Sequence, residues 1–391
     1  MLPAATFSGL GGPEMGLAGQ LRIVRAEDVA HMGITEVLRH MPRVFRAYRS
    51  LVAHLRRDRP AIAILIDFPD VNFRLAKHCK RLGIPVVWFV SPQLWAWKRR
   101  RLRWIRQRVS KMLVIFPFEA PFYRNRGVDA EFVGHPLAML PLPATSRAEY
   151  AAQFKLDPEK QWIAILPGSR HKELQANLPI MVEAVAALGS GFEYLVPLAS
   201  TVGEQDVRRI LAERASSLTH TYPEFRPPFR LVPDARAALC HSRASVVASG
   251  TATVQALTIG NPFVVVYHVS CLTFALAKRL VRYPPEIPAQ IDADGNVPIA
   301  MVNLIAGRRI VPELLNRRFT AQNLAATLRP LLEDTPAHTQ MIADLAEARA
   351  KLLPPAASTP SSTPIQRVCD AIEELLRINP ADTAQNRHSN V

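Results

Sequence analysis

The chain has 391 residues, of which 49% are hydrophobic and 21% are charged. These proportions exclude a disordered chain, and the length is sufficient for two globular domains. A formal net charge of +15 predicts attraction to polyanions: nucleic acid, phosphorylated substrates or an anionic membrane surface.

Four cysteines are scattered along the chain without metal-binding spacing, which favours a reduced compartment: Cys79, Cys240, Cys271 and Cys369. The N-terminus has neither the basic start nor the apolar core of a signal peptide. Residues 244–277 lack Asp, Glu, Lys and Arg, but the stretch contains Gly, Pro, Asn and His, so we do not expect a membrane span.

The first half alternates between strand and helix patterns. Apolar runs predict strands, and segments of about ten residues with helical periodicity separate them. This alternation is typical of parallel βαβ units and a doubly wound sheet. The predicted strands are residues 61–67, 84–90, 111–116 and 130–134.

A stretch rich in Pro and small residues, 136–148, predicts a linker, after which the alternation resumes. We therefore predict an α/β protein with two Rossmann-like, doubly wound domains facing a central cleft, since clefts between domains are preferred ligand sites. The predicted divisions are 1–138, 149–353 and a C-terminal connection, helix and tail over 354–391. The expected strands of the second half lie within 162–170, 192–199, 229–232, 244–250 and 262–269, and we expect mainly helix after Arg308.

The first predicted strand runs directly into Asp67, and Asp70 and Asn72 follow within the next helix. Ligands bind outside the carboxyl ends of parallel strands, so Asp67 is a candidate catalytic group. The alternative is that Asp67 or Asp70 caps this helix.

Two strand-to-helix turns in the second half have the composition of anion-binding loops. Ser169 and Arg170 lie in "LPGSRHKEL" (166–174), and Ser249, Gly250 and Thr251 lie in "ASGTATVQAL" (248–257). Small residues allow backbone N–H groups to approach a phosphate at a helix start. Each turn alone also fits an ordinary capped helix, but the two together favour a nucleotide-linked ligand.

Residues 98–111 contain eight Lys or Arg and no acid, and Trp95, Trp97 and Trp104 lie among or beside them. Basic residues mixed with Trp are typical of a membrane interface. A solvated helix face with tryptophans packed in the core is the alternative. Nucleic acid is not expected, because no recognition motif accompanies the charge.

Several of these segments, in order, make the chain resemble the lipid-A-disaccharide synthase family, glycosyltransferases of the GT-B fold. The matching stretches are "MGITEVLRH" (32–40), "IDFPDVNFRLAK" (66–77), "VSPQLWAWKRRRLRWI" (90–105), "FPFEAPFYRNRGVDAEFVGHPL" (116–137), the two turns above and "NLIAGRRIVPELL" (303–315).

The resemblance implies transfer from UDP-2,3-diacylglucosamine to 2,3-diacylglucosamine 1-phosphate, with inversion, giving lipid A disaccharide 1-phosphate and UDP. It implies no cofactor and no metal. It makes Asp67 the base, with Asp70, Asn72 and His135 as possible site residues. The nucleotide-sugar site would comprise Ser169, Arg170, Glu173, Ser249, Gly250, Thr251, Gln255, Asn303 and Glu313. The acyl-substrate and membrane surface would comprise Trp95, Trp97, Arg99, Arg100, Arg103 and Trp104, on a cytoplasmic enzyme peripheral to the inner face of the inner membrane, with a homodimer left open.

The chain departs from the family pattern at its start. Family members open with a strand and a Gly-Glu-x-Ser-Gly-Asp loop, whereas "GLGGPEM" (9–15) matches a later family stretch. We therefore expect an acceptor-side domain without its first βα unit, through either a misassigned start codon or a shortened relative. Gln255 also stands where the family usually has Glu.

Two other functions stay open from the sequence. One is another GT-B enzyme that uses a UDP-sugar, for which acyl chains on the donor would be irrelevant. The other is a truncated relative that binds membrane without turnover. His135, beside the linker, is as consistent with hinge packing as with a site role.

Overall fold

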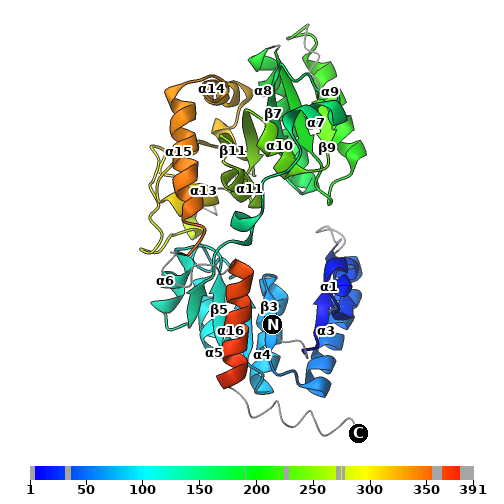
Figure 1. The fold of residues 1–391 in the computed structure, drawn as a ribbon, viewed down its shortest axis with the longest axis vertical. Coiled ribbons are helices and arrows are strands. Elements are labelled where there is room, and N and C mark those ends of the chain that lie inside the picture. Colours follow the sequence, from blue (N-terminus) through cyan, green and yellow to red (C-terminus); the bar gives the residue numbers. More distant parts are fainter. Residues whose placement is uncertain are drawn as a thin grey trace. The chain divides into compact units, whose positions relative to one another are not determined.

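The computed structural model forms two compact units, Met1–Gly134 with Ala356–Val391 (unit 1) and His135–Pro355 (unit 2). It describes residues 5–30, 37–189, 191–223, 229–269, 274, 278–354 and 363–378. Each unit has a sheet of parallel strands joined through helices, so the predicted α/β class is confirmed (Figure 1). The division between the units precedes the Pro-rich stretch 136–148.

Unit 1 contains a parallel four-stranded sheet in the order β3-β4-β5-β6. Because the spatial order follows the chain order, the loops after successive strands lie next to one another at one edge. The strands are β3 (Ala63–Ile66), β4 (Val86–Phe89), β5 (Lys111–Val114) and β6 (Ala130–Phe132). The intervening helices are α4 (Pro69–Arg81), η1 (Arg99–Arg101), α5 (Leu102–Arg108) and α6 (Glu119–Arg124).

The N-terminal part of unit 1 contains elements that the sequence did not predict. Strands β1 (Ser8–Gly11) and β2 (Leu21–Arg25) pair in parallel as a separate two-stranded sheet around α1 (Pro13–Leu17). Among the described residues, β3 pairs only with β4, and Ile66 at its end is 44% exposed. The remaining helices of this unit are α2 (Glu27–Ala30), α3 (Val37–Asp58) and α16 (Pro364–Ile378).

Unit 2 contains a parallel six-stranded sheet in the order β12-β11-β10-β7-β8-β9. The chain proceeds outward from β7 through β8 to β9, and then returns to the other side of β7 with β10. The strand order therefore reverses between β7 and β10, which is a topological switch point. The strands are β7 (Gln161–Leu166), β8 (Phe192–Pro197), β9 (Phe229–Val232), β10 (Ala244–Ala248), β11 (Phe263–Tyr267) and β12 (Glu313–Leu315).

The core of unit 2 lies on both faces of this sheet. Side chains of its central strands such as Trp162, Val247 and Val264 are fully buried, as expected for a sheet covered by helices on two sides. The helices are η2 (Pro136–Met139), α7 (Arg147–Phe154), α8 (His171–Leu188), α9 (Glu204–Leu218), α10 (Ala235–His241), α11 (Thr251–Ile259), α13 (Met301–Ala306), η3 (Asn316–Arg318), α14 (Ala321–Leu332) and α15 (Pro336–Ala350). None of the helices that the structure describes combines the length and apolar character needed to cross a bilayer.

His135 links the first turn of unit 2 to the C-terminal end of the same unit by a backbone hydrogen bond. Its backbone N–H donates to the Leu352 carbonyl at 2.8 Å, and its Nδ1 accepts from the Leu137 N–H at 3.2 Å. The side chain is buried, and this burial lowers the pKa of His135 from 6.5 to about 4. The imidazole is therefore neutral in the folded protein at neutral pH.

The depressed pKa of His135 makes stability depend on acidity. Between the two pKa values the unfolded chain binds a proton that the folded chain does not, so this stabilisation is complete above about pH 6.5 and is lost as pH falls. We expect His135 to cost about 2 kcal/mol of unfolding free energy at about pH 5 relative to about pH 7.5. Denaturant unfolding of wild type and His135→Gln at both pH values measures this difference. The exposed His220, changed to Gln, is the control, and an equal pH response in wild type and His135→Gln would contradict the assignment.

Candidate active site

Asp67 lies at the carboxyl edge of the unit 1 sheet, in a strained turn. Asp67 and Phe68 both have positive φ, 44° and 41°, and left-handed backbone is costly for residues with a side chain. The Asp67 N–H donates to the Phe89 carbonyl at 3.0 Å, which extends the β3–β4 pairing by one residue. Its side chain is exposed, and none of the described residues hydrogen-bonds or ion-pairs with its carboxylate.

Asn72 supports this turn from the first turns of α4. The buried Asn72 amide donates from Nδ2 to the Ile66 carbonyl at 3.2 Å and to the Asp67 carbonyl at 2.6 Å. The helix begins at Pro69 with Phe68 as its N-cap and without a side-chain cap, so Asp67 does not cap it. Asp70 ion-pairs with Arg101 at 2.8 Å instead. The Asp67 side chain thus differs from those of Asn72, which holds the turn, and Asp70, which is ion-paired.

Glu119 is a polar residue near this edge that the sequence analysis missed. It is the first residue of α6 and is 1% exposed. Its Oε1 accepts from Ser91 Oγ at 2.7 Å and from Trp95 Nε1 at 3.0 Å, and its Oε2 accepts from the Phe116 N–H at 3.1 Å. Burial raises the pKa of Glu119 to about 7, against the lowering effect of these hydrogen bonds. The available signal was a single acid within the apolar stretch "IFPFEAPF" (115–122).

The basic and aromatic segment after β4 is only partly exposed. The prediction that Trp95 belongs to an exposed surface is wrong, because Trp95 is 2% exposed and packs on Phe118 with its ring centroid 5.2 Å away. Trp97 is 48% exposed, with Lys98 Nζ 3.9 Å from its ring centroid. Arg99, Arg100 and Arg103 are exposed.

Trp104 is half-buried against α4. It packs edge-to-face on Phe73 at 5.5 Å between ring centroids, and the guanidinium groups of Arg101, Arg103 and Arg108 lie 5.2 to 5.9 Å from its ring. Arginines therefore surround this tryptophan, which joins the charged helix α5 to the core through one face.

In unit 2, the two predicted anion-binding turns emerge side by side at the topological switch point. Strands β7 and β10 pair directly, with Leu166 opposite Val247. The turns that follow, at 167–170 and 249–250, therefore leave the sheet from adjacent strands, and each opens a helix. Backbone N–H groups at two helix starts are thus available at one edge.

The first turn carries an internal carboxylate. Glu173 accepts from the Ser169 N–H at 3.0 Å and from Arg170 Nη1 at 2.8 Å. The Arg170 side chain is nevertheless 80% exposed. Gly168 has a φ of 123°, and a Cβ there would lie 2.6 Å from Glu173, so only glycine fits beneath this carboxylate. Thr201 Oγ1 additionally donates to the Ser169 carbonyl.

The second turn is more open. Gly250 precedes α11 with a φ of 152° and has no side chain to cap the helix, while Thr251 is exposed at its first position. Thr253 bonds back to the Gly250 carbonyl from its Oγ1 at 2.7 Å and fixes the turn. Gln255 is half-buried one turn further along α11.

Asn303 and Glu313 form a buried network that holds α13 to β12. Asn303 Nδ2 donates to Glu313 Oε1 at 2.8 Å, and Asn303 Oδ1 accepts from the Ile310 and Val311 N–H groups. Glu313, whose side chain has no exposed area, also accepts from the Ala300 N–H and pairs with Arg309 at 3.2 Å. In the structure these two side chains bond to backbone and side-chain groups around α13 and β12. Their contact with a ligand stays a prediction.

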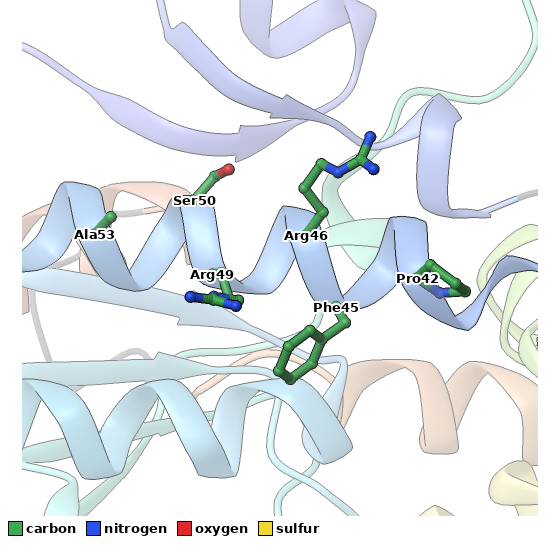
Figure 2. A pocket seen from close by; sticks show the side chains of 6 residues that line it. All are labelled: Pro42, Phe45, Arg46, Arg49, Ser50 and Ala53. Atoms are coloured by element: carbon green, nitrogen blue, oxygen red, sulfur yellow. The ribbon is translucent and has the colours of Figure 1, made fainter.

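A shallow pocket of about 490 Å³ lies along α3, and none of the predicted site residues lines it. Figure 2 shows that one helix supplies the whole lining, with Arg46 projecting to one side and Phe45 to the other. The lining residues are Pro42, Phe45, Arg46, Arg49, Ser50 and Ala53. This pocket therefore does not mark the candidate site.

Comparison with known proteins decides the family. The family model described as "Lipid-A-disaccharide synthetase" matches residues 1–358. The chain belongs to the lipid-A-disaccharide synthase family. Proteins named lipid-A-disaccharide synthase from Acidobacterium capsulatum and Koribacter versatilis are 50% and 46% identical, over 95% and 90% of this chain and 90% and 86% of those relatives.

Solved structures confirm the GT-B-type fold of this family member. The calicheamicin glycosyltransferase CalG4 superposes with a TM-score of 0.54 at 13% identity, covering 95% of this chain and 90% of that chain. UGT89C1 of Arabidopsis thaliana, complexed with UDP-L-rhamnose, gives a TM-score of 0.56 at 14% identity, covering 96% and 93%. At these identities the likeness concerns the fold alone.

Proposed function

We propose that this glycosyltransferase of lipid A biosynthesis joins UDP-2,3-diacylglucosamine to 2,3-diacylglucosamine 1-phosphate, forming lipid A disaccharide 1-phosphate and UDP. The observation that carries the proposal is the pair of anion-binding turns at the switch point of unit 2, in a chain that belongs to this family. Another type of UDP-sugar enzyme is less favoured, because five relatives with 36–50% identity are each named lipid-A-disaccharide synthase.

In the proposed donor site, the diphosphate of the UDP-sugar lies against the starts of α8 and α11. Ser169, Ser249, Gly250 and Thr251 offer backbone N–H groups and hydroxyls, and Arg170 offers a guanidinium fork. The Ser169 N–H and Arg170 are bonded to Glu173 in the ligand-free chain, so a phosphate oxygen would replace a carboxylate oxygen there. Gln255 would hold the ribose hydroxyls, and Asn303 and Glu313 would support the site through α13.

In the proposed chemical step, the acceptor 6-hydroxyl attacks the donor anomeric carbon while Asp67 takes its proton. The new bond forms as the bond to the UDP oxygen breaks, and the opposite face of attack inverts the configuration. The negative charge that develops on UDP is stabilised by Arg170 and the helix starts. The Asp67 carboxylate suits a general base because it is exposed and pairs with no cation among the residues that the structure describes.

The proposed role of Asp67 as the general base is tested by replacing its carboxylate with an amide. We expect Asp67→Asn to reduce kcat by about 10² to 10⁴, because a general base contributes about that much, while UDP affinity stays unchanged. Asp70→Asn is the matched control, since that neighbouring carboxylate is held by Arg101. The measurements are transfer assays with the acylated sugar pair and calorimetric UDP binding. Turnover that survives in Asp67→Asn would remove Asp67 from the mechanism.

Arg170 is tested against a second cation of the same helix turn. We expect Arg170→Ala to weaken UDP binding about tenfold or more, because a hydrogen bond to a charged group contributes roughly 1.5–3 kcal/mol. Lys172→Ala removes an equal charge from an exposed neighbour and should have a much smaller effect. Equal losses in calorimetric titrations of both variants would mean that only net charge matters.

We further propose that the exposed basic residues of η1 and α5 place the enzyme on the inner face of the inner membrane, where its acylated substrates lie. Trp97 adds an exposed indole beside them. Basic side chains near an anionic surface each contribute about 1 kcal/mol, and Trp favours the headgroup level.

Charge removal tests this surface. We expect the triple change of Arg99, Arg100 and Arg103 to Gln to lower binding to anionic vesicles about a hundredfold at low salt, with less difference at high salt. Vesicle sedimentation measures the binding.

The control for this experiment is the triple change of Arg208, Arg209 and Arg317 to Gln, which removes the same charge from exposed positions of unit 2. If both triple variants lose the same affinity, the attraction is a property of net charge rather than of η1 and α5.

A further inference from the structure

The loop of residues 91–98, which follows β4, is fixed from beneath by one buried carboxylate. Glu119 accepts from Ser91 Oγ at the start of the loop and from Trp95 Nε1 in its middle. Tyr123, on the same helix, donates its hydroxyl to the Pro92 carbonyl at 2.8 Å. Helix α6 therefore holds this loop through three side-chain hydrogen bonds.

The surroundings of Glu119 require an acceptor at both carboxylate oxygens. Ser91 and Trp95 meet Oε1, and the Phe116 N–H meets Oε2. No basic side chain among the described residues forms a salt bridge with Glu119, and hydrogen bonds from neutral groups, with the backbone of Ile115 among them, oppose the effect of its burial. An amide presents an NH₂ group in place of one oxygen, and that group would face a donor at whichever end it lies. The site is thus built for a carboxylate, at the desolvation cost of a buried acid.

The loop starts beside Asp67. The Asp67 N–H bonds to the Phe89 carbonyl, and the next residue, Val90, is a β-branched residue with a φ of 63°. Left-handed backbone at such a residue persists only where neighbouring structure imposes it. The anchored residues Ser91 and Trp95 follow directly, and the loop then presents the exposed Trp97 and Lys98.

We propose that Glu119 is a positioning residue for the acceptor: it fixes the 91–98 loop at the sheet edge where Asp67 lies, and this loop forms part of the binding surface for the acylated sugar phosphate. The inference rests on the proposed function, in which Asp67 meets the acceptor. Glu119 itself is too buried to touch a substrate, so it acts through Trp97 and Lys98. Lys98 supplies a cation for a sugar phosphate, and the Trp97 ring supplies an apolar face for a sugar or an acyl chain.

This role predicts a specific kinetic pattern. We expect Glu119→Gln to raise the acceptor KM and the acceptor Kd on the order of ten- to a hundredfold, because small displacements of a binding group have effects of this size. The donor KM should be unchanged, and kcat at saturating acceptor should stay within about threefold, as expected when binding rather than chemistry is lost. Steady-state assays and calorimetric titration with the acceptor measure these quantities.

Two further variants keep the inference testable if Glu119→Gln folds poorly. Trp95→Phe retains an aromatic ring and removes only the Nε1–H donor, so it should shift the acceptor KM in the same direction by a smaller factor. Glu193→Gln is the matched control: this carboxyl is 5% exposed in unit 2 and accepts from the Asp157 N–H at 2.9 Å. It should leave acceptor affinity unchanged.

The outcomes separate this inference from the proposed function. Unchanged acceptor affinity in Glu119→Gln and Trp95→Phe would overturn the positioning role while wild-type transfer upholds the function. Equal increases in donor and acceptor KM would also overturn it, because they indicate a general structural defect. A wild-type chain that does not bind the acceptor would overturn both.

Discussion

Parallel pairing of β7 with β10 is the constraint on which the site proposed in unit 2 depends. Leu166 lies opposite Val247, so two turns distant in sequence leave adjacent strands at the same edge. In a parallel sheet all carboxyl ends lie at one edge, and the reversal of strand order leaves space between the helices that follow. Side chains on both faces of these two strands are buried, as expected for central strands of a parallel sheet that is covered by helices on two sides.

The parallel sheet of unit 1 also brings the loops after its strands to one edge, but the backbone there is strained. Its strands follow chain order, so the residues after β3, β4 and β5 lie next to one another at one edge. Asp67, Phe68 and Val90 there have left-handed backbone, each at a cost of roughly 1–3 kcal/mol. Asn72 and Glu119 counter this cost with hydrogen bonds to the strained segments or to residues beside them. Strain and its supporting side chains are therefore concentrated where the proposed chemistry takes place.

The sequence predicted the features that depend on local patterns. Apolar runs identified the central strands, and Gly, Ser and Thr after two of them identified the turns of unit 2. Contacts between distant segments were not predictable in this way. Trp95 packs on Phe118 and donates to Glu119, both in the segment after β5, and a Trp beside arginines looks like surface when those partners are unknown. Strand β12 was missed because three residues after Pro312 are too few to show alternation, and pairing with β11 stabilises it.

Three carboxylates near one sheet edge of unit 1 differ in their surroundings, and this difference supports the roles proposed for them. Asp70 is exposed, but its Oδ1 forms an ion pair with Arg101. Glu119 is buried beneath three donors and out of reach of any substrate. Asp67 is exposed, its carboxylate has no partner in the described part of the chain, and it follows the end of β3 with a strained backbone. Environment rather than residue type thus distinguishes the acid proposed as the base from the two acids that hold structure, as in enzymes that give neighbouring carboxyl groups different functions.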